Sequence, residues 1–140
     1  MGYGNGVRLV AVWFALDVVL VVLFAAAGRQ SHNEVATIVG IADTAWPFLL
    51  GLLVGWVITR QWQTTTTGLP IVFQVWPAAI MLAFVTWAFA LAIRVLAGDT
   101  NSGGFPFVAL GFLLLMLVGW RIVWGSVVRV RAQRSNDMRD

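Results

Sequence analysis

Four long apolar runs constrain the fold of this chain more than any other feature. They cover residues 9–27, 45–62, 71–93 and 105–128. A helix rises about 1.5 Å per residue, so a run of roughly 20 residues can cross the hydrocarbon core of a bilayer, which is about 30 Å thick. The chain is 60% hydrophobic and 11% charged, and a soluble domain of 140 residues has too little interior for so many apolar side chains. We therefore predict an all-α, four-helix transmembrane bundle formed by residues 1–128, with the lipid bilayer as its surroundings.

The arginines indicate the orientation of this bundle. The N-terminus, the end of the second run beside the second connection, and the basic tail at 129–140 contain most of them: Arg8, Arg60, Arg129, Arg131, Arg134 and Arg139. The first and third connections contain only Arg29 and Arg94. Basic residues collect on the cytoplasmic side of membrane proteins, so we expect both termini in the cytoplasm and the chain in a prokaryotic plasma membrane. Because the positive charge lies at the ends of apolar runs, we expect it to anchor the bundle and expect no nucleic-acid partner.

One acid, Asp17, lies in the middle of the first apolar run. A carboxylate at that depth costs about 2.5–3.5 kcal/mol on insertion scales, so it needs a partner, a proton or water. Asp17 lies nine residues after Arg8, and Arg121 lies eight residues before Arg129. These offsets put the two groups at similar depths, about 13 and 12 Å from the same interface. We predict an intramembrane pair of Asp17 and Arg121, which either fixes the helix register or forms a proton- or cation-coupled site.

A second group of polar residues is expected at the opposite face of the membrane. We call it the outer-face polar cluster, and its members are Arg29, His32, Asp43 and Arg94. Such a cluster can sense pH or bind an anion, although a charged surface loop is the simpler interpretation. We expect Arg94 to reach toward the interface or to pair with Asp43. With no cysteine and one histidine in the chain, we expect no metal, no cofactor and no enzyme activity.

The second run contains residues typical of helix packing. Gly51 and Gly55 form a GxxxG motif, which allows another helix to approach closely. Pro47 lies near the start of this run, where a helix tolerates a missing N–H. We expect the helix to begin near Ala45, capped by the residue at 43 or 44. The alternative is a longer helix from about residue 34, kinked at Pro47, with Asp43 inside the membrane.

The second and fourth runs also resemble each other. Each begins with Pro-Phe and later contains Leu-Val-Gly-Trp, as in WPFLLGLLVGW and FPFVALGFLLLMLVGW. The spacing between these two marks differs by five residues. An old hairpin duplication and convergence on common membrane-helix composition both explain the pattern.

Several short motifs resemble those of one known family. They are Asp17, GRxSH at 28–32, TAWPF at 44–48, GxxxGW at 51–56, Arg94 followed by Gly98, and LVGWR at 117–121. Together they resemble the DUF3054 family of prokaryotic membrane proteins over residues 8–121. The resemblance implies a four-helix integral membrane protein and supplies no reaction, substrate or partner.

The residues leave several functions open. We favour an accessory or structural subunit of a larger membrane complex, because the chain is small and its connections are short. The alternative is a proton- or ion-coupled transporter or channel that uses Asp17, for which we expect a homodimer because four helices leave little room for a pathway. A membrane enzyme or redox component has only His32 in its favour.

Overall fold

The computed structural model describes residues 3–31, 37–64, 70–99, 101 and 103–137. Its α-helices are α1 (Tyr3–Ser31), α2 (Ile38–Thr59), α3 (Ile80–Leu96), α4 (Phe105–Leu113) and α5 (Gly119–Asp137). Three short helical turns complete the described part: η1 (Ile71–Phe73), η2 (Val75–Ala79) and η3 (Leu114–Val118). The turn η2 leads into α3, and η3 joins α4 to α5. The prediction of an all-α fold is confirmed.

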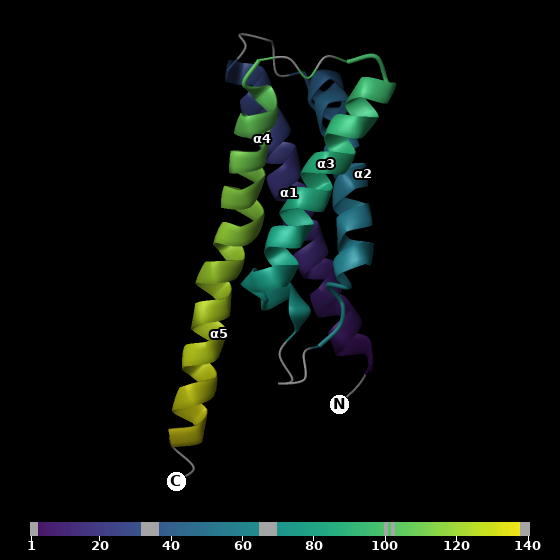
Figure 1. Ribbon diagram of the computed structural model, residues 1–140. Coiled ribbons are helices and arrows are strands. Elements are labelled where there is room, and N and C mark those ends of the chain that lie inside the picture. The colour runs from purple at the N-terminus through teal and green to yellow at the C-terminus, as the bar shows by residue number, and fades with distance from the viewer. Residues whose placement is uncertain (1–2, 32–36, 65–69, 100, 102, 138–140) are drawn as a thin grey trace.

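Four helical stretches are long and apolar enough to cross a membrane. They are Arg8–Arg29, Ile38–Thr59, Val75–Leu96 and Phe105–Val128. The stretches alternate in direction, and both chain termini lie at the same end of the bundle, which we call the terminal end (Figure 1). We call the opposite end the far end. This architecture is the predicted four-helix bundle and fits a small membrane protein.

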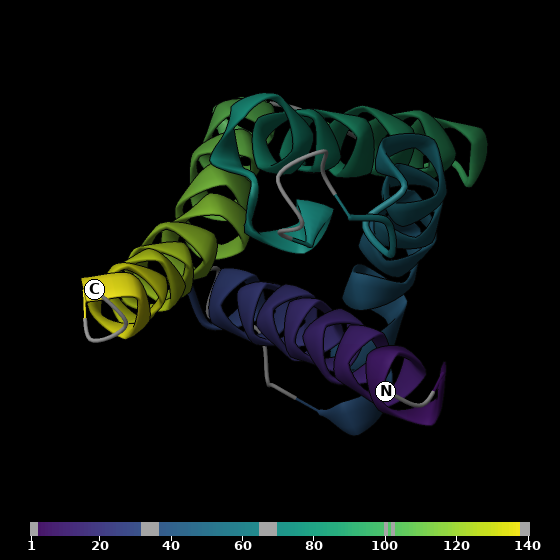
Figure 2. The same ribbon diagram turned by 90° about the horizontal axis from the view of Figure 1, so that it is seen from below.

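The four stretches form a ring rather than two separate layers. Seen along the bundle from the terminal end, α1, α2, α3 and the α4–α5 stretch follow one another around the ring (Figure 2). The segment of η1 and η2 lies between the helices at this end (Figure 2). Its side chains Val72, Ala78 and Ala79 are buried. The segment of η1 and η2 therefore contributes apolar side chains to the interior at the terminal end.

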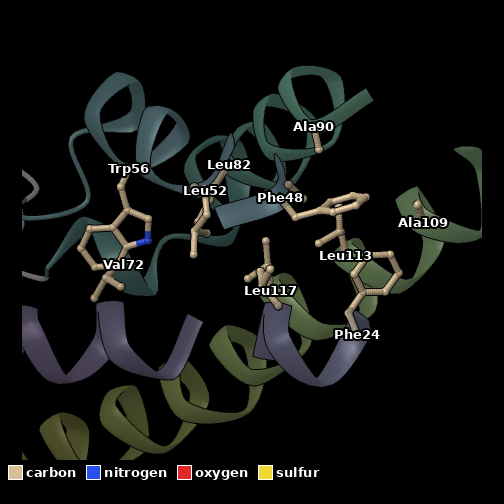
Figure 3. Close-up of a cluster of buried hydrophobic side chains, with 12 residues drawn as sticks. Phe24, Phe48, Leu52, Trp56, Val72, Leu82, Ala90, Ala109, Leu113 and Leu117 are labelled. Carbon is tan, nitrogen blue, oxygen red and sulfur yellow. The ribbon is translucent and has the colours of Figure 1, made fainter. Parts of the chain in front are cut away.

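The interior of the ring is a continuous apolar core. Phe24 packs edge-on against Phe48, with ring centroids 4.9 Å apart, and Leu113 lies beside them (Figure 3). Trp56 and Val72 lie at the other side of the same cluster (Figure 3). Large apolar side chains also cover the outside of the helices, which is where lipid would contact them.

The GxxxG motif places α2 against α3. A Cβ atom added to Gly51 would lie 2.5 Å from the backbone oxygen of Thr86. A Cβ atom added to Gly55 would lie 2.7 Å from Cδ1 of Leu82. The two glycines therefore permit a helix contact that larger residues would prevent.

The start of α2 differs from our preferred expectation. The helix begins at Ile38 rather than near Ala45, and its N-cap is Thr37, whose Oγ1 accepts a hydrogen bond from the Gly40 N–H at 3.1 Å. Pro47 is buried inside the helix. The expectation of a cap at residue 43 or 44 was therefore wrong. A membrane helix tolerates an internal proline because neighbouring helices compensate for the lost backbone bond.

The basic tail is helical as far as the structure describes it. The helix α5 continues to Asp137 and extends past the other helices at the terminal end (Figure 1). At 1.5 Å per residue, the path from Phe105 to Asp137 is roughly 50 Å long. This length exceeds the hydrocarbon core of a bilayer, so the end of α5 projects beyond it.

Candidate functional site

Asp17 on α1 and Arg121 on α5 meet in the interior of the bundle. Both side chains have 0% exposure. Nη2 of Arg121 donates to Oδ2 of Asp17 at 2.6 Å, and Nη1 donates to Oδ1 at 2.8 Å. Two parallel bonds from one guanidinium to one carboxylate form a bidentate ion pair, the strongest geometry for these groups. The structure thus brings together the two residues that the depth argument paired.

Two tryptophans complete the coordination of Asp17. Nε1 of Trp56, on α2, donates to Oδ2 at 2.8 Å. Nε1 of Trp120, on α5, donates to Oδ1 at 2.9 Å. Each carboxylate oxygen therefore accepts one guanidinium N–H and one indole N–H, and the carboxylate joins three helices. We call Asp17, Trp56, Trp120 and Arg121 the Asp17 centre.

Sequence reasoning missed the role of these tryptophans. The available signal was the repeated Leu-Val-Gly-Trp motif, because Trp56 and Trp120 end its two copies. The tryptophan of each motif, Trp56 on α2 and Trp120 on α5, donates a hydrogen bond to the Asp17 carboxylate on α1. The repeat therefore has a shared structural role, whichever origin explains it.

The helix around Arg121 contributes to its position. The turn η3, which comes just before α5, is π-helical rather than α-helical. Such wide turns rotate the residues that follow them and are frequent at functional sites. Nη1 of Arg121 also donates to the carbonyl oxygen of Leu117 at 2.7 Å, which ties the guanidinium to its own helix. Nε of Arg121 is buried without a hydrogen-bond partner in the described part of the chain.

Aromatic side chains enclose the Asp17 centre toward the terminal end. Trp13 stacks on Trp120 with ring centroids 5.2 Å apart and an interplanar angle of 11°. Phe73 of η1 packs edge-on against Trp13, with centroids 5.2 Å apart. The guanidinium carbon of Arg121 lies 4.5 Å from the Trp120 ring centroid, a cation–π distance. Enclosure by apolar rings keeps water from the ion pair and strengthens its electrostatic attraction.

In the outer-face polar cluster, Arg94 belongs to a local contact at the corner between α3 and α4. Its Nε donates to Oδ1 of Asn101 at 3.1 Å, and its Nη1 lies 3.7 Å from Oδ2 of Asp99. The guanidinium carbon also lies 4.8 Å from the Phe105 ring centroid. The expected pairing of Arg94 with Asp43 is therefore not present. Asp99 and Asn101 follow Arg94 closely in sequence, so they reach its side chain at a lower entropic cost than Asp43, which is distant in sequence.

Arg29 belongs to a different contact, between α1 and α2. Its Nη1 donates to Oγ1 of Thr44 at 3.4 Å. Asp43 is exposed on α2, and His32 lies outside the described residues. The structure therefore shows no direct contact among the three described members of the cluster, Arg29, Asp43 and Arg94. Among the residues that the structure describes, no three side chains of the types that bind metals are grouped closely enough to hold an ion.

Comparison with known proteins gives one match. A family model described as a protein of unknown function, DUF3054, matches residues 14–124. This range contains all four residues of the Asp17 centre. No curated protein and no solved structure matches the chain.

Proposed function

The chain belongs to the DUF3054 family, a family of unknown function, and from this premise we propose that it is a non-catalytic structural subunit of a complex in a prokaryotic plasma membrane. The small bundle, its short connections and the arrangement of its buried charges support this role. We further propose that the terminal end faces the cytoplasm, since Arg8, Arg60, Arg131 and Arg134 are exposed there.

The observation that carries the proposal is the enclosure of Asp17. A carboxylate that couples transport to a proton or cation must exchange its partners with water during each cycle. Asp17 has 0% exposure, and its two oxygens accept four hydrogen bonds from buried or half-buried donors. This arrangement suits a fixed connection between α1, α2 and α5. We infer that the Asp17 centre sets the relative height of three helices and so presents a constant outer surface to partner subunits.

The alternative is a transporter or channel in which Asp17 takes up and releases a proton or cation. It requires Asp17 to separate from Arg121 during the cycle. Breaking a buried ion pair costs about 3–5 kcal/mol, which another interaction would have to offset. A structural role needs no such step.

Two measurements test the proposal. The first compares proton and ion flux in proteoliposomes that contain the wild type with flux in protein-free vesicles and in vesicles with the Asp17→Asn variant. We expect no flux above the protein-free level. A flux that wild type shows and a folded Asp17→Asn variant lacks would replace our proposal with the transporter.

The second measurement is purification of the tagged chain from its own membrane at native expression level in a mild detergent. We expect a partner in a constant molar ratio that survives salt washing. A matched variant, Asp99→Asn, changes an exposed acid far from the Asp17 centre and should retain the same partner. Recovery of the chain alone, or only with a second copy of itself, would contradict the role as a subunit.

A further inference from the structure

The arginines at the two ends of the bundle differ in what they contact. At the far end, the Arg94 side chain is 16% exposed and bonded to its neighbours, and Arg29 contacts Thr44. At the terminal end, the guanidinium groups of four exposed arginines form no hydrogen bond or ion pair with the described part of the chain. These residues are Arg8, Arg60, Arg131 and Arg134, and we call them the terminal-end arginines. Among the arginine side chains that the structure describes, those without a hydrogen bond or ion pair therefore all lie at the terminal end.

The exposed acidic side chains that the structure describes lie at the far end. Asp43 and Asp99 are exposed at the far end. Two further acids, at 137 and 140, follow the last of the terminal-end arginines in the sequence. None of the acidic side chains that the structure describes forms an ion pair with the four guanidinium groups.

The depths of these arginines match one headgroup layer. The Trp13 and Trp124 rings lie 5.5 Å apart, so they mark a common level on α1 and α5. Arg8 lies five residues from Trp13, or about 7.5 Å toward the terminal end. Arg131 and Arg134 lie about 10.5 and 15 Å beyond Trp124 in the same direction. These three residues thus lie within about 8 Å along the bundle, close to the thickness of one polar layer of a bilayer.

Apolar side chains continue next to the arginines on α5. Val123 is 66% exposed, and Val127 and Val130 are also exposed beside Arg131 and Arg134. A ligand that covers this surface must therefore present an anionic group and a hydrocarbon chain to the same helix. An anionic phospholipid has both parts, whereas free phosphate or a nucleic acid has no hydrocarbon chain.

We propose that the terminal-end arginines bind the phosphate groups of anionic phospholipids in the leaflet at the terminal end. A guanidinium matches the geometry of a phosphate and forms two parallel hydrogen bonds with it. A zwitterionic lipid carries its own cation and competes poorly for these groups. This inference rests on the membrane-spanning architecture and is independent of the proposed role as a subunit.

The test measures the thermal stability of the full chain in a neutral detergent through its tryptophan fluorescence. We compare added dioleoylphosphatidylglycerol with dioleoylphosphatidylcholine at equal mole fraction, and with inorganic phosphate. We expect the anionic lipid to raise Tm more than either of the others. At about 1 M salt the Debye length falls to about 3 Å, and the difference should largely disappear.

Three variants identify the residues responsible. Each basic residue near an anionic surface contributes on the order of fivefold in affinity, so Arg131→Gln/Arg134→Gln should weaken binding of the anionic lipid by roughly 25-fold in native mass spectrometry. Both positions lie on the part of α5 that projects past the bundle, so the fold should be retained. The charge-conserving Arg131→Lys/Arg134→Lys variant should keep most of the affinity. The matched control Arg94→Gln, at the far end, should bind the anionic lipid as wild type does.

Several outcomes would overturn the proposal. Equal stabilisation by both lipids would show that the arginines do not select the anionic headgroup. Equal stabilisation by inorganic phosphate would assign the site to a free anion. Unchanged lipid binding in the double glutamine variant would show that α5 does not contribute.

Discussion

Replacing Asp17 by asparagine tests the structural role of the Asp17 centre directly. The change removes the negative charge and leaves the Arg121 guanidinium buried at 0% exposure without a counter-charge. The new amide NH₂ group also faces N–H donors that lie 2.6–2.9 Å from the original carboxylate oxygens, so hydrogen bonds are lost as well. Removing one partner of a buried ion pair costs about 3–5 kcal/mol, and we expect Asp17→Asn to lower the free energy of unfolding by about 4 kcal/mol.

A double-mutant cycle separates the pair interaction from other effects. Arg121→Gln alone should also lower the free energy of unfolding by about 3–5 kcal/mol, because it leaves the Asp17 carboxylate buried without a cation. The Asp17→Asn/Arg121→Gln variant contains no buried charge, so its loss should be smaller than the sum of the single losses by about 2–3 kcal/mol. The assay is reversible unfolding in mixed micelles, followed by tryptophan fluorescence. Asp99→Asn changes an acid that is 51% exposed and serves as the control, with an expected effect below about 1 kcal/mol.

Two results would refute this reasoning. One is an Asp17→Asn variant whose free energy of unfolding lies within about 1 kcal/mol of wild type, since no buried ion pair can be lost so easily. The other is a coupling energy below about 0.5 kcal/mol in the cycle, which would mean that the two charges act independently.

Four further predictions concern the packing of α2, α3 and α4. Gly51→Ala should lower the free energy of unfolding by about 3 kcal/mol, because its Cβ would lie 2.5 Å from the backbone oxygen of Thr86; thermal unfolding of the purified variant checks this. Gly55→Ala should cost only about 1 kcal/mol in the same assay, because its Cβ meets the flexible end of Leu82, and equal losses in the two variants would contradict the difference. Thr86→Val should leave stability unchanged or raise it by up to about 1 kcal/mol, because the buried hydroxyl oxygen has no partner in the described structure; a clear drop in Tm would reveal a hidden partner. Asn101→Ala should lower stability by about 1 kcal/mol, because its amide donates to the carbonyl oxygen of Leu91 at 2.9 Å and accepts from an arginine, and faster hydrogen exchange at the end of α3 would check the local origin of the loss.

The ion pair was predictable because depth in a membrane is a one-dimensional quantity. Residue offsets from Arg8 and Arg129 give the heights of Asp17 and Arg121, and the cost of a lone charge then favours their contact. The rotation of each helix about its axis is a separate quantity that these offsets do not contain. The repeated Leu-Val-Gly-Trp motif singles out Trp56, but it does not show that the indole N–H faces Asp17, since tryptophan also serves packing and interfacial anchoring.

The start of α2 shows a second limit of structure prediction from the sequence. Rules for soluble helices place Pro47 in the first turn, because an internal proline removes a backbone hydrogen bond. In lipid the chain has no water to replace helical bonds, so continuing the helix from Thr37 is preferable to exposing an irregular segment. Pro47 does remove one backbone hydrogen bond, but the cost of an irregular segment in lipid outweighs this loss, and the helix continues through the proline.

The ties between Asp17 and the last helix have a consequence for biosynthesis. The residues joined by the ion pair are separated by 104 positions in the sequence. At about 5–20 residues per second, the ribosome needs roughly 5–20 s to supply Arg121 after Asp17 has emerged. During that interval, Trp56 is the one member of the Asp17 centre that can already donate a hydrogen bond to the Asp17 carboxylate, because Trp120 and Arg121 have not yet been synthesised. Neutralisation of the buried Asp17 charge by Arg121 therefore waits for the completion of the C-terminal helix, and a chain truncated before Arg121 should be a substrate for membrane quality control.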